Sequence, residues 1–89
     1  MLTTIQAGAF KRDVKRAKKR HKDMGKLREL LRLLVEQRPL PARYRDHGLT
    51  GGWAGFRDAH IEPDWLLIYR IQGDELQLAR TGTHADIFE

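Results

Sequence analysis

The sequence contains no cysteine and no long apolar run, and each absence excludes a class of protein. Without cysteine, the 89-residue chain has neither a disulfide framework nor a thiolate metal site. No apolar segment approaches the roughly 20 residues that cross a bilayer. Residues 1–6 also lack the basic stretch followed by apolar residues that marks a secretory signal. We therefore expect a cytoplasmic protein with no membrane contact.

Length and charge indicate one small domain, residues 1–89, with two electrically different halves. Residues 1–45 contain 14 Lys and Arg against 4 Asp and Glu, a balance of +10, whereas residues 46–89 contain 3 against 8, a balance of −5. The basic half suits a polyanion, most simply RNA, because each neutralised phosphate releases counterions. Taken alone, such a basic helix is more often a solvated face. The basic positions on and just after the first predicted helix are Lys11, Arg12, Lys15, Arg16, Lys18, Lys19, Arg20 and Lys22.

Hydrophobic periodicity predicts an α+β fold: a short N-terminal strand, a two-helix hairpin and a three-stranded antiparallel meander. We expect one antiparallel-dominated sheet with both helices packed on one of its faces. The segment 65–71 is apolar on both faces until Arg70, so alternation does not show which face the helices cover. Asp23 is the expected N-cap of the second helix. The predicted ranges are a strand at 2–6, helices at 8–22 and 24–37, a long loop at 39–52, strands at 53–60, 65–72 and 75–81, and turns at 61–64 and 73–74.

Three of the four histidines and one aspartate occur at turns and strand ends in the second half: His47, His60, Asp64 and His84. The first and third strands of a meander run in the same direction, so their ends can lie together. This topology predicts that His60, Asp64 and His84 share one patch, while the place of His47 depends on the path of the loop. Histidine titrates near neutral pH and suits proton transfer during RNA cleavage, where the 2′-OH is the nucleophile.

Other side chains could assist that chemistry. Arg57 and Arg80 are candidates for binding phosphate oxygens, since a guanidinium can contact them in a bidentate manner. Phe88 or Trp65 could stack on a splayed base.

Structural roles compete with these functional ones. His60 could be the hydrogen-bonded partner of a nearby carboxylate, His47 an ordinary loop residue, and Asp64 the cap of a turn. Phe88 could anchor the tail in the core. Arg80 could form a structural ion pair, and the partners considered for it are Asp58 and Glu62.

A metal site is a further alternative. Three histidines and an aspartate could bind Zn or Mn, but no two of them show a recognised ligand spacing such as H-E-x-x-H. His60 and Asp64 are four residues apart, yet Pro63 works against a helix that would present both. We therefore expect no metal and no cofactor.

Four segments resemble the YafQ toxins of the RelE/ParE superfamily of toxin–antitoxin systems: Lys19–Met24, Asp46–Leu49, Gly55–Tyr69 and Arg80–Ala85. The resemblance implies a RelE/ParE-like fold and an endoribonuclease that cleaves messenger RNA in the ribosomal A site without a metal. It also implies a cognate antitoxin, often of the DinJ type. The chain departs from the family pattern at Gly48, where a proline is common, and at Asp86-Ile87, where smaller or apolar residues are common. The family's functional residues fall on His47, His60, Asp64, Arg80, His84 and Phe88.

The resemblance fixes the location of the site better than the role of each residue. Two other functions stay open: a non-catalytic poison of a protein target such as gyrase, as in ParE-like members, and a plain RNA-binding module. In the nuclease reading, the basic helices contact ribosomal RNA. The roles we expect there are Asp64 or His60 as general base, His84 as general acid, Arg80 and His47 as stabilisers of the phosphorane, and Phe88 as a base-stacking residue.

Overall fold

Five strands form one mixed sheet in the order β1-β5-β4-β3-β2. The computed structural model describes residues 1–89. The edge strand β1 (Thr3–Gln6) runs parallel to β5 (Glu75–Gly82), and all other neighbours are antiparallel. The other strands are β4 (Trp65–Gln72), β3 (Arg57–Glu62) and the two-residue β2 (His47–Gly48). The predicted meander is therefore confirmed as β3, β4 and β5, with one further strand at each edge.

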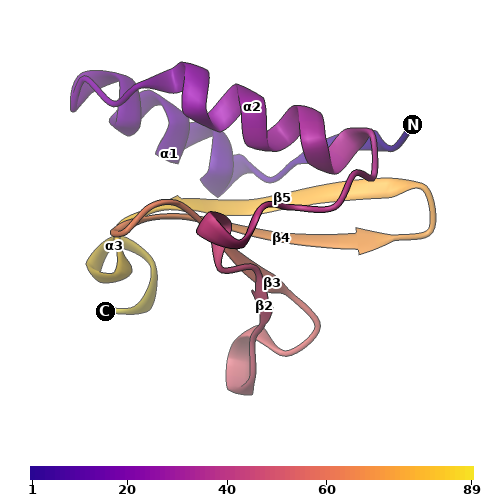
Figure 1. Ribbon diagram of the computed structural model, residues 1–89. Helices are drawn as coiled ribbons and strands as arrows, with labels where there is room; N and C mark the ends of the chain where they lie inside the picture. Colours follow the sequence, from indigo (N-terminus) through magenta and orange to yellow (C-terminus); the bar gives the residue numbers. More distant parts are fainter.

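Two helices, α1 (Gly8–Lys19) and α2 (Met24–Val35), cover one face of the sheet, as predicted (Figure 1). Asp23 is the N-cap of α2, because its side chain accepts the Gly25 N–H at 3.0 Å. Both helices end slightly earlier than the sequence indicates. His21 and Gln37 adopt left-handed backbone conformations, with φ of 59° and 55°, and these residues turn the chain away from the helix axis.

The core lies between the helices and the facing side of β4 and β5. Leu27 of α2 and Leu67 and Tyr69 of β4 belong to one cluster of 14 buried residues. Leu66 and Ile68 are fully buried but lie outside that cluster. Because side chains alternate along a strand, these two face the other side of the sheet. Both faces of β4 are thus covered, which explains why its sequence shows no alternation.

The predicted strand at 53–60 is wrong at its start, because β3 begins only at Arg57. Gly51 and Gly55 have φ of +65° and +91°, and the segment Gly51–Trp53 forms a 3-10 turn instead of extended chain. The loop at 39–52 contains a second 3-10 turn, Ala42–Tyr44, followed by β2.

The tail after β5 forms a short helix that the sequence analysis did not predict, α3 (His84–Phe88). Its start is a capping box, in which the Thr83 hydroxyl accepts the Asp86 N–H at 3.0 Å and the Asp86 carboxylate accepts the Thr83 N–H at 2.9 Å. Figure 1 shows α3 beside the ends of β4 and β5, on the opposite side of the sheet from α2. None of the helices is long and apolar enough to cross a membrane.

Candidate active site

Asp58 and His60 point to the side of the sheet away from α1 and α2. They are two residues apart on β3, so they share one face, while Ala59 between them belongs to the helix-side core. Across the ladder they pair with Ile68 and Leu66, which are fully buried on the same outer face. Asp58 and His60 therefore lie beside buried apolar side chains of β4.

His47 joins this pair through β2. It lies opposite Asp58 in the β2–β3 register, so the loop brings it onto the face where His60 lies. The ring centroids of His47 and His60 are 6.1 Å apart. The loop, whose path the sequence left open, therefore places His47 beside Asp58 and His60.

Hydrogen bonds fix which nitrogen of each ring carries a proton in the neutral state. His47 Nδ1 lies 2.7 Å from the Arg45 carbonyl oxygen, and His60 Nδ1 lies 3.3 Å from the Pro63 carbonyl oxygen. A carbonyl only accepts, so each Nδ1 is the donor and each neutral Nε2 is free to accept a proton. Both Nε2 atoms lie 3.8 Å from Asp58 Oδ2.

Asp58 is a site residue that sequence reasoning missed. Its side chain is buried, and its Oδ1 has no hydrogen-bond partner. Burial raises the pKa of this carboxyl above its ordinary value, while the positive charges of His60, His47 and His84 oppose that rise. The signal that could have revealed it is its spacing from His60, because residues i and i+2 of a strand share a face.

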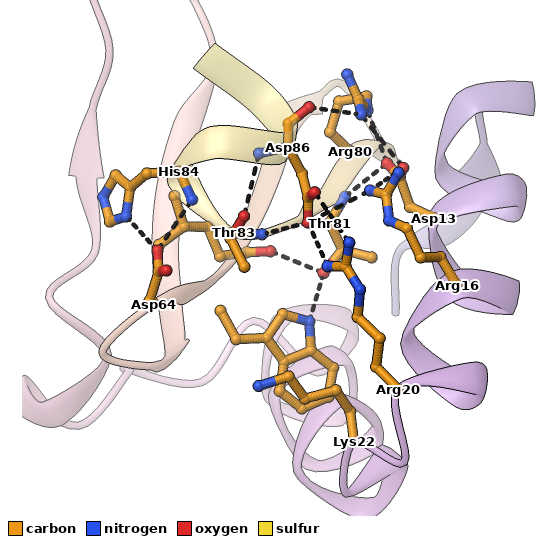
Figure 2. A network of polar contacts seen from close by, with 12 residues as sticks. Asp13, Arg16, Arg20, Lys22, Asp64, Arg80, Thr81, Thr83, His84 and Asp86 are labelled. Atoms are coloured by element: carbon orange, nitrogen blue, oxygen red, sulfur yellow. Dashed lines mark hydrogen bonds and ion pairs between the residues drawn. The ribbon is translucent and has the colours of Figure 1, made fainter. Parts of the chain in front are cut away.

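His84 and Asp64 form the second half of the site (Figure 2). Asp64 Oδ1 accepts two hydrogen bonds, from His84 Nδ1 at 2.6 Å and from the His84 backbone N–H at 2.9 Å. The backbone hydrogen bond, followed by the imidazole one, lowers the pKa of the Asp64 carboxyl. The His84 ring centroid is 5.8 Å from that of His60. The prediction that His60, Asp64 and His84 share one patch is confirmed.

The two aromatic candidates differ in their exposure. Phe88 on α3 is 42% exposed, and its ring centroid lies 6.3 Å from that of His84, so one edge of the site carries an open aromatic face. Trp65 is only 1% exposed, and its Nε1–H donates to the Thr81 hydroxyl at 3.0 Å. The prediction that Trp65 could stack on a base is wrong, because its ring lies inside the core.

Both candidate arginines are bound to carboxylates. Arg57 donates to Asp46 from Nε at 3.2 Å and from Nη2 at 3.0 Å, and its side chain is 45% exposed. Arg80 donates from Nε to Asp13 at 2.7 Å and is 23% exposed. The prediction that Arg80 pairs with Asp58 or Glu62 is wrong, because its partner is Asp13. Arg57 shares a face of β3 with Ala59 and points to the helix side, so it is not placed to bind a phosphate beside His60, contrary to the prediction. Arg80 lies opposite Ile68, on the side of the sheet where His60 lies.

The predicted docking residues fall into two groups. Arg16, Arg20 and Lys22 form ion pairs within the chain, with Asp13, Asp86 and Glu62. The other five form no ion pair, and all are exposed. These free cations, on one helix, are Lys11, Arg12, Lys15, Lys18 and Lys19.

The site also groups three metal-ligating side chains. One ligand atom from each of His47, Asp58 and His60 lies within 4.8 Å of the other two. Two imidazoles and a carboxylate suit a borderline divalent ion such as Zn²⁺. Spacing along the sequence did not reveal this grouping, because Asp58 was not considered as a ligand.

The structure thus combines three features. They are a small mixed sheet covered by two basic helices, a row of imidazoles on the outer side of the sheet, and an exposed phenylalanine at the end of that row. A family model of bacterial type II toxin–antitoxin toxins matches almost the whole chain, which defines the class of protein. The chain belongs to the YafQ family, since the family model described as "Bacterial toxin of type II toxin-antitoxin system, YafQ" matches residues 2–89.

Individual relatives agree with this assignment. The chain is 55% identical over 83 residues to the "mRNA interferase toxin YafQ" of Escherichia coli K12, covering 92% of this chain and 90% of that one. The structure superposes with a TM-score of 0.92 on one chain of the "E.coli DinJ-YafQ complex", at 51% identity over 100% of both chains. It also superposes with a TM-score of 0.93 on a "metal-bound toxin from Helicobacter pylori", at 37% identity over 99% of this chain and 100% of that one.

Proposed function

We propose that this protein is a messenger RNA interferase, a toxin that a DinJ-like antitoxin binds and silences. It cleaves messenger RNA in the A site of translating ribosomes in the cytoplasm, by general acid–base catalysis with no metal or small-molecule cofactor. The observation that carries the proposal is the row of three imidazoles, with ring centroids 6.1 Å and 5.8 Å apart, on one sheet face. The relatives named above support the same activity and the same kind of partner.

His60 is the general base. Its Nδ1–H is held by the Pro63 carbonyl, which leaves the Nε2 lone pair to take the proton from the 2′-OH. Asp64, the other candidate from the sequence, is a poorer base, because two hydrogen bonds from His84 lower its pKa and occupy Oδ1. The structure therefore favours one of the two alternatives left open.

His84 is the general acid. Asp64 holds its Nδ1–H, so that Nε2–H can protonate the leaving 5′ oxygen. The 2′ oxygen attacks phosphorus after losing its proton to His60, and the bond from phosphorus to the 5′ oxygen then breaks. The products are a 2′,3′-cyclic phosphate, which can open to a 3′-phosphate, and a 5′-hydroxyl.

Positive charge near the phosphorane comes from His47 and Arg80. His47 lies beside His60 on the same face. Arg80 lies opposite Ile68, which faces that side of the sheet, and its Nη2 donates to the Asp86 carbonyl of α3, the helix that carries His84. Preorganised charge of this kind contributes several kcal/mol to the transition state, and each acid–base group about 10²–10⁴-fold in rate. Phe88 stacks on a base beside the scissile bond, as its exposed ring allows. The five free cations of α1 contact ribosomal RNA.

Expression without an antitoxin tests the proposal against its rivals. Wild type, His84→Ala and the control His21→Ala are compared by growth and by mapping messenger RNA ends on translating ribosomes. His21 is the matched control because it is the one histidine outside the site, in the turn between α1 and α2. We expect cleavage and growth arrest from wild type and His21→Ala only. Growth arrest by His84→Ala with intact messages would instead support a protein-target poison. If wild type bound RNA without cleaving it, the protein would be a plain RNA-binding module.

A further inference from the structure

The helix that carries His84 and Phe88 is too short to hold its own position. α3 has five residues, and isolated helices shorter than about 12 residues are marginal in water. The proposed acid must nevertheless lie within reach of the leaving oxygen. Some contact outside α3 therefore has to fix it.

Asp86 makes that contact through its side chain (Figure 2). Its carboxylate receives Arg20 Nη1 at 2.7 Å and Arg20 Nη2 at 3.2 Å, a bidentate pair that joins α3 to the end of α1. The same carboxylate accepts the Thr83 N–H at 2.9 Å and lies 3.6 Å from Arg16 Nη2. One side chain thus closes the start of α3 and attaches it to a helix on the other side of the sheet.

The backbone of Asp86 is held as well. Its carbonyl oxygen accepts Arg80 Nη2 at 3.3 Å, and Arg80 is itself bound to Asp13 of α1. Gly82 permits the close approach, since a Cβ at that position would lie 2.9 Å from the Asp86 Cβ. The side chain of Asp86 is 14% exposed, so little water competes for these bonds.

We propose that Asp86 and Arg20 form a positioning pair that holds α3 so that His84 and Phe88 face the reacting RNA. The inference rests on the proposed function of His84. It assigns Arg20 to the site, and not to ribosomal RNA docking as the sequence analysis expected.

The charge state of Asp86 also supports this assignment. The hydrogen bonds from Arg20, followed by those of the capping box, hold the pKa of the Asp86 carboxyl far below its ordinary value, so the pair stays charged at neutral pH.

A double-mutant cycle on the cleavage reaction tests the pair. Asp86→Asn keeps an acceptor for the Thr83 N–H but removes the charge, and Arg20→Ala removes the partner. We expect each variant to lower kcat about 10–100-fold, since a misplacement of about 1 Å can cost 10²-fold. KM should stay within about twofold of wild type. The double variant should be no worse than either single variant, because both remove the same contact.

Two variants serve as controls. Arg20→Lys retains the charge and should recover most of kcat. Glu29→Gln weakens an ion pair of the same kind, with Arg32 at 2.7 Å on α2, and should leave kcat and KM unchanged.

Several results would overturn the inference. One is a kcat for Asp86→Asn within twofold of wild type, and another is additive effects in the double variant. A change in KM alone would also overturn it, and would assign Arg20 to docking. His84→Ala is measured in the same assay. A fully active His84→Ala would overturn the proposed function, whereas an inactive His84→Ala beside a fully active Asp86→Asn would overturn only the positioning role.

Discussion

Replacing Asp13 with alanine should remove the main polar link between α1 and β5. Asp13 is 3% exposed, and its carboxylate accepts hydrogen bonds from Arg80 Nε at 2.7 Å, Arg16 Nη2 at 2.8 Å and the Thr81 N–H at 3.1 Å. The parallel pairing of β1 with β5 ends at Leu78, so Thr81 has no strand partner on that side. Asp13 takes the place of the missing strand.

The expected loss in free energy of unfolding follows from these contacts. A buried N–H left without a partner costs about 1–3 kcal/mol, and a hydrogen bond to a charged group contributes about 1.5–3 kcal/mol. Arg80 is 23% exposed and can regain water, so Asp13→Ala should fall at about 3–4 kcal/mol, in the lower part of the range for a broken buried ion pair. At about 4–8 °C per kcal/mol for a domain of this size, Tm should fall by about 12–32 °C.

Urea unfolding, monitored by circular dichroism, measures this loss in the free energy of unfolding directly. Asp13→Asn keeps an acceptor for the Thr81 N–H and should lose about half as much. Glu29→Ala breaks an exposed pair with Arg32 and should change stability by less than about 1 kcal/mol. A value for Asp13→Ala within about 1 kcal/mol of wild type would refute the reasoning.

Three further outcomes follow. Asp58→Asn should raise stability at pH 7 by about 1 kcal/mol, because burial raises the pKa of this carboxyl and its charge opposes folding once pH exceeds the ordinary Asp value; urea midpoints check this. The pKa values of Asp64 and Asp86 are lowered, so their contribution is complete above about pH 4 and is lost as pH falls through the folded values. Urea midpoints of wild type should therefore drop in acid, and Asp86→Asn should lose less. Stripping metal from the toxin with a zinc-selective chelator and gel filtration, before ribosomes are added, should leave the cleavage rate within about twofold.

Local sequence patterns predicted the elements whose determinants lie close along the chain. The Asp23 cap, the apolar stripes of the helices and the turn at 73–74 each involve neighbours within a few residues. The capping box of α3 is equally local, since Thr83 and Asp86 are three residues apart. Its helix could have been predicted.

Long-range polar contacts could not have been predicted in the same way. Arg80 and Asp13 are 67 residues apart, and no periodicity links them. The position of Asp13 at the open edge of β5 depends on where β1 ends and how α1 packs. The burial of Trp65 could not be predicted either. Its strand is apolar on both faces, so the sequence does not reveal which of its aromatic residues are exposed.

The central claim is that His84 protonates the leaving 5′ oxygen, and a sulfur substitution tests it most directly. A messenger RNA with a bridging 5′ sulfur at the scissile position has a leaving group that departs without a proton. On ribosomes carrying the ordinary message, His84→Ala should be slower than wild type by about 10²–10⁴-fold. On the sulfur message it should cleave within about tenfold of wild type, whereas His60→Ala should stay slow on both. A His84→Ala variant that the sulfur message does not accelerate would contradict the account.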